Sequence, residues 1–167
     1  MVIRKLTPAD AERYRDIRLR SLKEHPDAFL TTYEVEITKP LETIRHNLQP
    51  TADKFTLGAF SDEGELAGVV TLVRESNPKL RHKANLYAMY VAPEYRKQRL
   101  GHALVSALLM EAKTCAGLER VHLTVISSNQ AAKRLYESLG FVCYATEKQA
   151  LKIDGAYWDE DFLSIRV

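Results

Sequence analysis

The segment from Tyr90 to Leu104 constrains this chain most, because it joins a strand pattern to a helix pattern through a dense basic loop. Residues 86–91 predict a strand, which Pro93 ends because proline cannot donate to a sheet ladder. The loop at residues 96–99 reads Arg-Lys-Gln-Arg, and Gly101 opens a helix with an apolar face. Free N–H groups and the helix dipole favour an anion at such a helix start. We therefore predict a site for an anionic ligand such as a pyrophosphate, with a solvated basic turn as the alternative.

Apolar periodicity and turn residues predict one mixed α/β domain over residues 1–167. Strands are predicted at residues 2–6, 55–60, 66–73, 85–91, 121–125, 141–153 and 157–165. Helices are predicted at about residues 7–24, 38–48 and 101–116, and from Ser127 or Ser128 to Leu139. Residues 28–37 are predicted to be irregular. The strand at 85–91, the helix after it and the strand at 121–125 form a predicted βαβ unit.

Composition argues against several classes of function. The net charge is +2, so bulk electrostatics give no reason to expect nucleic acid or a membrane surface as a partner. The two cysteines form no CxxC pair and the five histidines show no ligand spacing, so no metal site is expected. The longest apolar run, residues 67–73, is too short to span a bilayer, and the first residues lack the apolar core of a signal peptide. A cytoplasmic location is the expectation.

Two segments carry a resemblance to a known family. Residues 91–101, Val-Ala-Pro-Glu-Tyr-Arg-Lys-Gln-Arg-Leu-Gly, resemble the acetyl-CoA pyrophosphate loop of the GNAT N-acetyltransferases. Residues 128–141, which include Asn129, Tyr136 and Gly140, resemble the second GNAT signature at the family spacing. The ending, with Glu147, Asp154-Gly155 and Asp159-Glu160, looks like bacterial members. The resemblance implies a three-layer α/β fold, with a mixed, mostly antiparallel, twisted sheet of about seven strands flanked by about four helices.

The pyrophosphate loop departs from the family pattern, Arg/Gln-x-x-Gly-x-Gly/Ala, at one position. When Arg96 opens the pattern and Gly101 closes it, Arg99 holds the middle glycine position. A shifted register, from Gln98 through Gly101 to Ala103, matches literally, but the first register keeps Leu100 at an apolar position. If the middle position requires a positive φ, an arginine there costs roughly a kcal/mol or more, and the affinity for acetyl-CoA comes into question.

The resemblance also implies which residues hold acetyl-CoA. Met89 and Val91 would pair with pantetheine like an added strand, and a backbone N–H near Met89 or Tyr90 would stabilise the thioester oxygen as it gains charge. The same residues could form a plain core strand. The full set of implied acetyl-CoA contacts is Met89, Tyr90, Val91, Arg96, Lys97, Gln98, Arg99, Leu100, Gly101, His102, Ala103, Asn129 and Tyr136.

Tyr136 is the candidate general acid, because the leaving thiolate needs a proton. The transfer is uphill by about 2 kcal/mol at reference pKa values, which a short hydrogen bond can offset. The competing interpretation is an aromatic core residue on the face of Ala132 and Leu139. For Asn129, the alternative to a contact with acetyl-CoA is simple capping of the following helix.

The general base is not specified by the sequence. Some relatives carry a glutamate on the strand before the basic loop, but residues 86–89 here read Leu-Tyr-Ala-Met. Glu34 is the remaining candidate base, with a solvated loop charge or a water relay as alternatives. Phe29, Tyr33 and Glu34, in the irregular segment, are the candidate acceptor-binding residues. His102 is expected beside the phosphates or at the surface.

The predicted function is direct transfer of an acetyl group from acetyl-CoA to a primary amine. The alternative is a catalytically silent CoA-binding or acyl-CoA-binding sensor, and the absence of a Gly-Lys-Ser/Thr loop argues against a nucleotide-binding module. A small-molecule or a peptide amine would serve as acceptor, and a homodimer is left open. The missing strand carboxylate favours an amine of low pKa or a water relay, because a lysine-like amine costs roughly 4.6 kcal/mol to deprotonate at pH 7.

Overall fold

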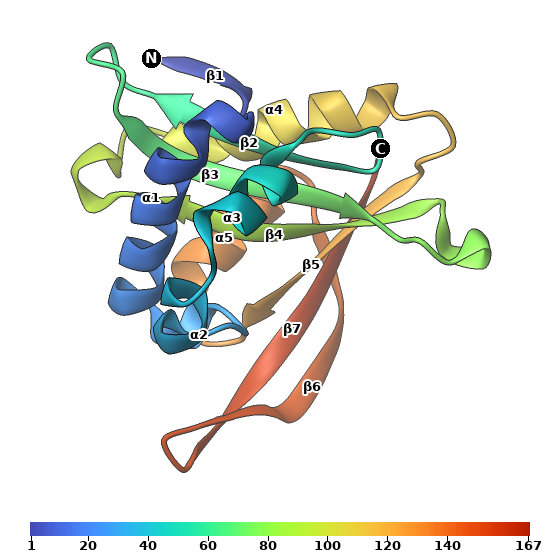
Figure 1. Ribbon diagram of the computed structural model, residues 1–167. Helices are drawn as coiled ribbons and strands as arrows, with labels where there is room; N and C mark the ends of the chain where they lie inside the picture. Colours follow the sequence, from blue (N-terminus) through green and yellow to red (C-terminus); the bar gives the residue numbers. More distant parts are fainter.

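The computed structural model describes all 167 residues, and one seven-stranded sheet forms its centre (Figure 1). The strands are β1 (Val2–Lys5), β2 (Lys54–Phe60), β3 (Leu66–Arg74), β4 (Lys83–Val91), β5 (Arg120–Ile126), β6 (Val142–Ile153) and β7 (Ala156–Arg166). Their order across the sheet is β1-β2-β3-β4-β5-β7-β6. Only β4 and β5 pair in parallel, so the predicted mixed, mostly antiparallel sheet is confirmed.

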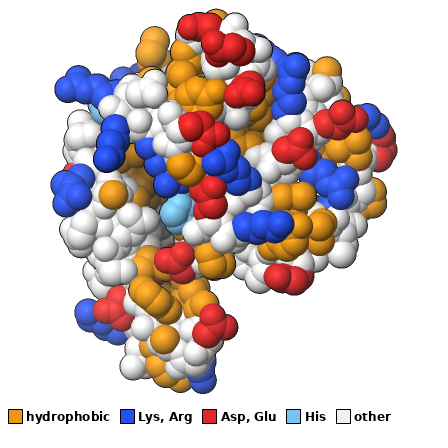
Figure 2. All heavy atoms as spheres, turned by 90° about the vertical axis from the view of Figure 1, so that its left-hand side faces the viewer, with side chains coloured by type: hydrophobic (Ala, Val, Ile, Leu, Met, Phe, Trp, Pro, Cys, Tyr) orange, Lys and Arg blue, Asp and Glu red, His pale blue; other side chains and the backbone are white.

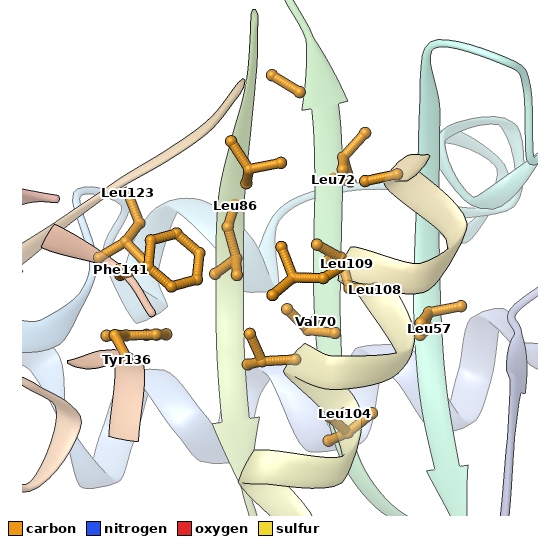
Figure 3. Close-up of a cluster of buried hydrophobic side chains, with 14 of the residues drawn as sticks. Leu57, Val70, Leu72, Leu86, Leu104, Leu108, Leu109, Leu123, Tyr136 and Phe141 are labelled. Atoms are coloured by element: carbon orange, nitrogen blue, oxygen red, sulfur yellow. The ribbon is translucent and has the colours of Figure 1, made fainter. Parts of the chain in front are cut away.

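Helices cover both faces of this sheet and make the fold three-layered (Figure 1). They are α1 (Ala11–Glu24), α2 (Tyr33–Ile37), α3 (Leu41–Leu48), α4 (Leu100–Thr114) and α5 (Gln130–Ser138). The leucines of α4 pack with β2, β3, β4 and Tyr136 in one buried cluster (Figure 3). A second cluster joins α1 and α3 to the other face through Ile17, Ile44 and Val69. None of the helices has the length and apolarity needed to cross a bilayer.

The segment predicted to be irregular contains a helix. α2 occupies residues 33–37, and the Thr32 hydroxyl accepts a hydrogen bond from Val35 N–H at its start. A five-residue helix is too short to give a periodic apolar pattern, which explains why the sequence did not reveal it. The fold therefore has five helices where the resemblance implied about four.

Strands β4 and β5 separate along their length, and this opening positions the site. Their parallel pairing covers only three residues, ending at Asn85 opposite His122. Beyond that point β4 carries a β-bulge, since Ala88 and Met89 together oppose Val70 of β3. Ala88 has φ of 53°, a conformation that few alanines adopt. Bulges bend a strand and redirect its side chains, so β4 leaves β5 where a ligand can enter between them.

Candidate active site

A large cleft of about 860 Å³ lies where the basic loop, the start of α4, the end of β4 and α5 meet. Most of the residues implied to hold acetyl-CoA line it: Met89, Tyr90, Val91, Arg96, Lys97, Arg99, Leu100, Gly101, His102 and Asn129. Gln98, Ala103 and Tyr136 are outside its lining. On the face of the molecule turned toward the viewer in Figure 2, lysine and arginine side chains border a hollow.

The basic loop has a backbone suited to an anion. Lys97 and Arg99 both have positive φ, 61° and 59°, and left-handed residues in a loop can turn neighbouring N–H groups toward one anion. Ala103 N–H bonds to Arg99 O at 3.0 Å, which leaves the earlier amides of α4 without helical acceptors. These amides and the helix dipole face the cleft, so the loop fits a pyrophosphate.

Gly101 keeps the cleft open beside this loop. A Cβ atom at this position would lie 3.2 Å from Met89 Cε and 3.3 Å from Leu135 Cδ2. Both of these side chains line the cleft, so any larger residue at position 101 would crowd its wall. Met89 and Leu135 give this part of the cleft a partly apolar wall.

The positive φ of Arg99 shows that the middle position of the loop does strain a non-glycine residue. We expect Arg99→Gly to raise the free energy of unfolding by about 0.5–1 kcal/mol, because glycine adopts this conformation freely. Arg99→Ala is the matched control, since it removes the same charge but keeps the Cβ and its strain. Urea unfolding measures both, and equal stability of the two variants would contradict this explanation.

Arg96 serves the structure of the loop more than it serves a ligand. Its Nε donates to Val91 O at 2.8 Å, and its Nη2 lies 3.4 Å from Glu24 Oε2 and 3.1 Å from His25 Nε2. These contacts tie the loop to the end of β4 and to the end of α1. Lys97 and Arg99 are exposed and make no side-chain hydrogen bond or ion pair, so they are the free cations of the cleft.

A second cavity of about 380 Å³ adjoins the cleft through the gap between β4 and β5. Six residues line both spaces: Asp27, Ala28, Phe29, Met89, Asn129 and Ala132. Thirteen of its nineteen lining residues are hydrophobic, and its charged members are Arg18, Asp27 and Glu160. A group that passes from the cleft between the two strands therefore reaches a mostly apolar chamber with few polar groups.

Tyr136 faces this second cavity. Its residue is only 6% exposed, and its ring packs against the edge of Phe141 with 5.7 Å between ring centroids (Figure 3). Its hydroxyl makes no hydrogen bond to the protein and is not among the buried unpaired atoms, which belong to Arg18, His122 and Trp158. The ring is thus a core residue, while the hydroxyl remains open to the cavity. Burial raises the pKa of Tyr136 above its usual value, so the phenol keeps its proton at neutral pH.

Asn129 caps α5 and also lines both spaces. Its side-chain oxygen accepts a hydrogen bond from Ala132 N–H at 3.1 Å. The amide group of the same side chain is free to meet a ligand at the junction of cleft and cavity. The two roles considered for this residue are therefore compatible.

Asp161 anchors the start of α5 and so fixes the place of Tyr136. This buried carboxylate accepts hydrogen bonds from Ser127 and Thr146 at 2.7 Å and pairs with Lys133 at 2.5 Å. The Lys133 ammonium, followed by the Ser127 hydroxyl, lowers the pKa of Asp161 to about 2. The network joins β7, β6 and α5.

Acid should weaken this anchor. A carboxyl whose pKa is lower in the folded state stabilises the fold above its unfolded pKa, and this contribution disappears as the pH falls through the folded value. We expect the free energy of unfolding to drop between about pH 4 and pH 2. Asp161→Asn should be less stable than wild type at neutral pH and should show a shallower drop. Asp16→Asn, an exposed position on α1, is the control, and an unchanged acid profile in Asp161→Asn would contradict this role.

The candidate acceptor residues separate in the structure. Phe29 lines both spaces, whereas Tyr33 and Glu34 line neither. Tyr33 lies under the Lys23 ammonium, 4.4 Å from its ring centroid, and Glu34 is exposed on α2. The charged residues of the second cavity come from α1, from the turn after it and from β7. No local pattern in the sequence indicates that these three segments lie together.

Comparisons with known proteins agree with this arrangement. The model of the acetyltransferase (GNAT) family matches residues 17–141. The L-amino acid N-acyltransferase MnaT of Escherichia coli is 29% identical over 123 residues, which cover 65% of this chain and 71% of that protein. A mycothiol acetyltransferase of Nocardiopsis dassonvillei is 47% identical over 62 residues, 37% of this chain, and the match spans only 18% of that protein.

Solved structures extend the likeness to the whole chain. A GNAT acetyltransferase from Streptococcus pneumoniae has a TM-score of 0.92 at 26% identity and covers 99% of both chains. YncA of Salmonella typhimurium, solved with acetyl-CoA, shares the fold with a TM-score of 0.81 at 23% identity, over 99% of this chain and 93% of that one. The predictions of an acyltransferase, of acetyl-CoA as donor and of N-acetyl transfer are confirmed, and the alternative of a silent sensor finds no support. The chain belongs to the GNAT acetyltransferase family.

Proposed function

We propose that the large cleft holds acetyl-CoA and that a primary amine occupies the second cavity, so that transfer takes place at the gap between β4 and β5. The observation that carries this proposal is the junction itself. Two spaces of different character meet at Met89, Phe29 and Asn129, with a phosphate-type loop on one side and a protonated tyrosine on the other. Acetyl-CoA supplies the thioester, and the residues of this chain orient it and handle the protons.

Tyr136 would donate the proton that the leaving sulfur requires. Its hydroxyl opens on the second cavity and has no competing acceptor in the protein. Because burial raises its pKa, it holds that proton until a strong base such as a desolvated thiolate comes within reach. The apolar wall around it limits the access of water, which favours acetylation over hydrolysis.

Asp27 and Glu160 would receive the ammonium form of the acceptor and accept its proton. Both carboxylates line the second cavity, and neither makes a hydrogen bond or an ion pair with the protein. Glu34, the candidate base from the sequence, is exposed on α2 outside both spaces. A water relay that ends on Asp27 or Glu160 is consistent with the same placement.

Two of the related proteins are named as enzymes that transfer an acyl or acetyl group to an amino group. One matched protein is an L-amino acid N-acyltransferase, and another, in Escherichia coli, is a ribosomal protein bS18-alanine N-acetyltransferase, 44% identical over 59 residues. That second match covers 35% of this chain and 39% of the protein it matches. These names support a primary amine as the acceptor.

Single substitutions of the two carboxylates test the proton route. At pH 7 we expect Glu160→Gln or Asp27→Asn, whichever carboxylate is the base, to lower kcat/KM by about 10²–10⁴-fold. The loss should shrink as the pH rises toward the acceptor pKa, because the amine then arrives already neutral. Glu34→Gln is the control and should match wild type. Values within twofold of wild type for both variants at all pH values would reject this route.

A further inference from the structure

Arg18 is a cation without a counter-ion inside the protein. It extends from α1 to the wall of the second cavity, and its guanidinium carbon lies 4.6 Å from the centre of the Phe29 ring. None of its five N–H groups makes a hydrogen bond, and Nη1 is a fully buried nitrogen with no partner. Nε and Nη2 also have no partner in the protein and are not fully buried, so they can bond to a ligand. Burying unpaired donors of a charged group is unfavourable, which makes a missing partner the natural explanation.

The charged groups around Arg18 do not supply that partner. Asp27 and Glu160 line the same cavity, yet neither lies within ion-pair distance of the guanidinium. Glu36 lines a smaller adjoining space with Arg18, but its carboxylate already pairs with Lys39 at 2.8 Å. Lys54 lines that space too and adds positive charge there, because the charge of Lys39 is already offset by Glu36. An anion brought by a ligand would therefore meet a guanidinium with free donors.

The cavity thus presents one cation and two free carboxylates within apolar walls. A guanidinium binds a carboxylate through paired N–H bonds, while carboxylates attract an ammonium group. The apolar walls come from Leu86, Leu123, Val125 and neighbouring residues. A cavity of about 380 Å³ suits a small molecule better than a folded partner.

We propose that Arg18 binds the carboxylate of the acceptor, and that the acceptor is a free α-amino acid with an apolar side chain. The inference rests on the proposed function for the amine, but the role of Arg18 as a specificity residue can be tested without turnover. The guanidinium takes the carboxylate, Asp27 and Glu160 face the amine, and the apolar walls take the side chain. Arg18 touches no reacting atom and selects the acceptor by its charge.

Binding of an acetylated product can show how much the carboxylate alone contributes to affinity. Calorimetry compares N-acetyl-L-leucine with N-acetyl-L-leucinamide, which differ in that group alone. We expect the acid to bind wild type 10- to 100-fold more tightly than the amide, since hydrogen bonds between charged groups are strong. In Arg18→Met, which keeps an unbranched apolar stem but removes the guanidinium, this difference should vanish. Arg13→Met, an exposed arginine of the same helix, is the control and should keep it.

Several results would overturn the inference. Equal affinities for acid and amide in wild type, or no binding of either, would remove the evidence for a carboxylate site, and this comparison requires no variant. A preference for the acid that persists in Arg18→Met would assign it to another cation. Should Arg18→Met fold poorly, as judged by thermal unfolding, Arg18→Gln replaces it.

Turnover measurements show whether the carboxylate belongs to a free amino acid or to a peptide. They also test the proposed function independently of the role of Arg18. Wild type should prefer L-leucine to leucylglycine, whose carboxylate lies one residue farther from the amine, and a preference for the dipeptide would overturn the assignment of a free amino acid. Release of CoA with no amine at all, together with Arg18-dependent binding of N-acetyl-L-leucine, would reject the proposed function and leave the role of Arg18 standing.

Discussion

Tyr136→Phe is expected to lower kcat by about 10²–10⁴-fold and to leave the affinity for acetyl-CoA close to wild type. The substitution keeps the ring that packs on Phe141 and removes only the hydroxyl, which makes no hydrogen bond within the protein. The folded state should therefore be as stable as wild type, and the loss should belong to the chemical step. Steady-state kinetics with a saturating amine, together with calorimetric binding of acetyl-CoA, measure the two effects separately.

Tyr157→Phe is the matched control, because this tyrosine is exposed on β7 and its hydroxyl has no partner. The pH profile adds a second readout. Because burial raises the pKa of Tyr136, any loss of wild-type kcat from ionisation of this tyrosine should begin above the pH at which an ordinary tyrosine ionises, about 10. Unchanged kcat in Tyr136→Phe, under conditions where chemistry limits the rate, would reassign Tyr136 to packing alone.

Acetyl-CoA at about 100 times its Kd should raise the free energy of unfolding by roughly 2.7 kcal/mol, provided that it binds only the folded state. Its phosphates would meet the amides at the start of α4 and the free cations Lys97 and Arg99. Exposed charges are screened by salt, so the stabilisation at a fixed acetyl-CoA concentration should fall between 50 mM and 500 mM salt. Thermal or urea unfolding at several ligand concentrations gives both numbers.

Lys97→Gln should weaken acetyl-CoA binding and make it less dependent on salt. Lys79→Gln, at an exposed loop position outside the cleft, should change neither. No stabilisation by acetyl-CoA or by CoA would remove the basic loop from consideration as a phosphate site.

Local patterns in the sequence were enough to predict most of the fold. The apolar run of β3, the leucine face of α4 and the turn at Asp154-Gly155 each report a local preference, and the structure has those elements within a few residues of the predicted bounds. The cleft was also predictable, because the basic loop and α4 are adjacent in the chain and form the site by their own geometry. The family resemblance supplied the role of β4, which its apolar sequence alone would not have distinguished from that of a core strand.

The second cavity was not predictable in the same way. It depends on the bulge at Ala88, whose positive φ follows from the pairing with β3 and is not encoded by the residue type. Glu160 reaches it because β7 pairs with β5 so that Glu160 lies opposite Ile126. Arg18 of α1 lines the same cavity although it is more than a hundred residues from Glu160 in the sequence. The residues around a lone arginine on a helix, or around a glutamate in a charged run, do not indicate which distant segment will lie beside it.

Direct transfer to an amine is the central claim, and amine-dependent release of the CoA thiol tests it most directly. Wild-type protein is mixed with acetyl-CoA, with and without L-leucine, and free thiol and N-acetylated product are counted over several turnovers. We predict one thiol for each acetylated amine, no burst of thiol without the amine and no acetyl group left on the protein. Acetyl-CoA binding without amine-dependent thiol release, or an acetylated protein formed before the amine is added, would contradict it.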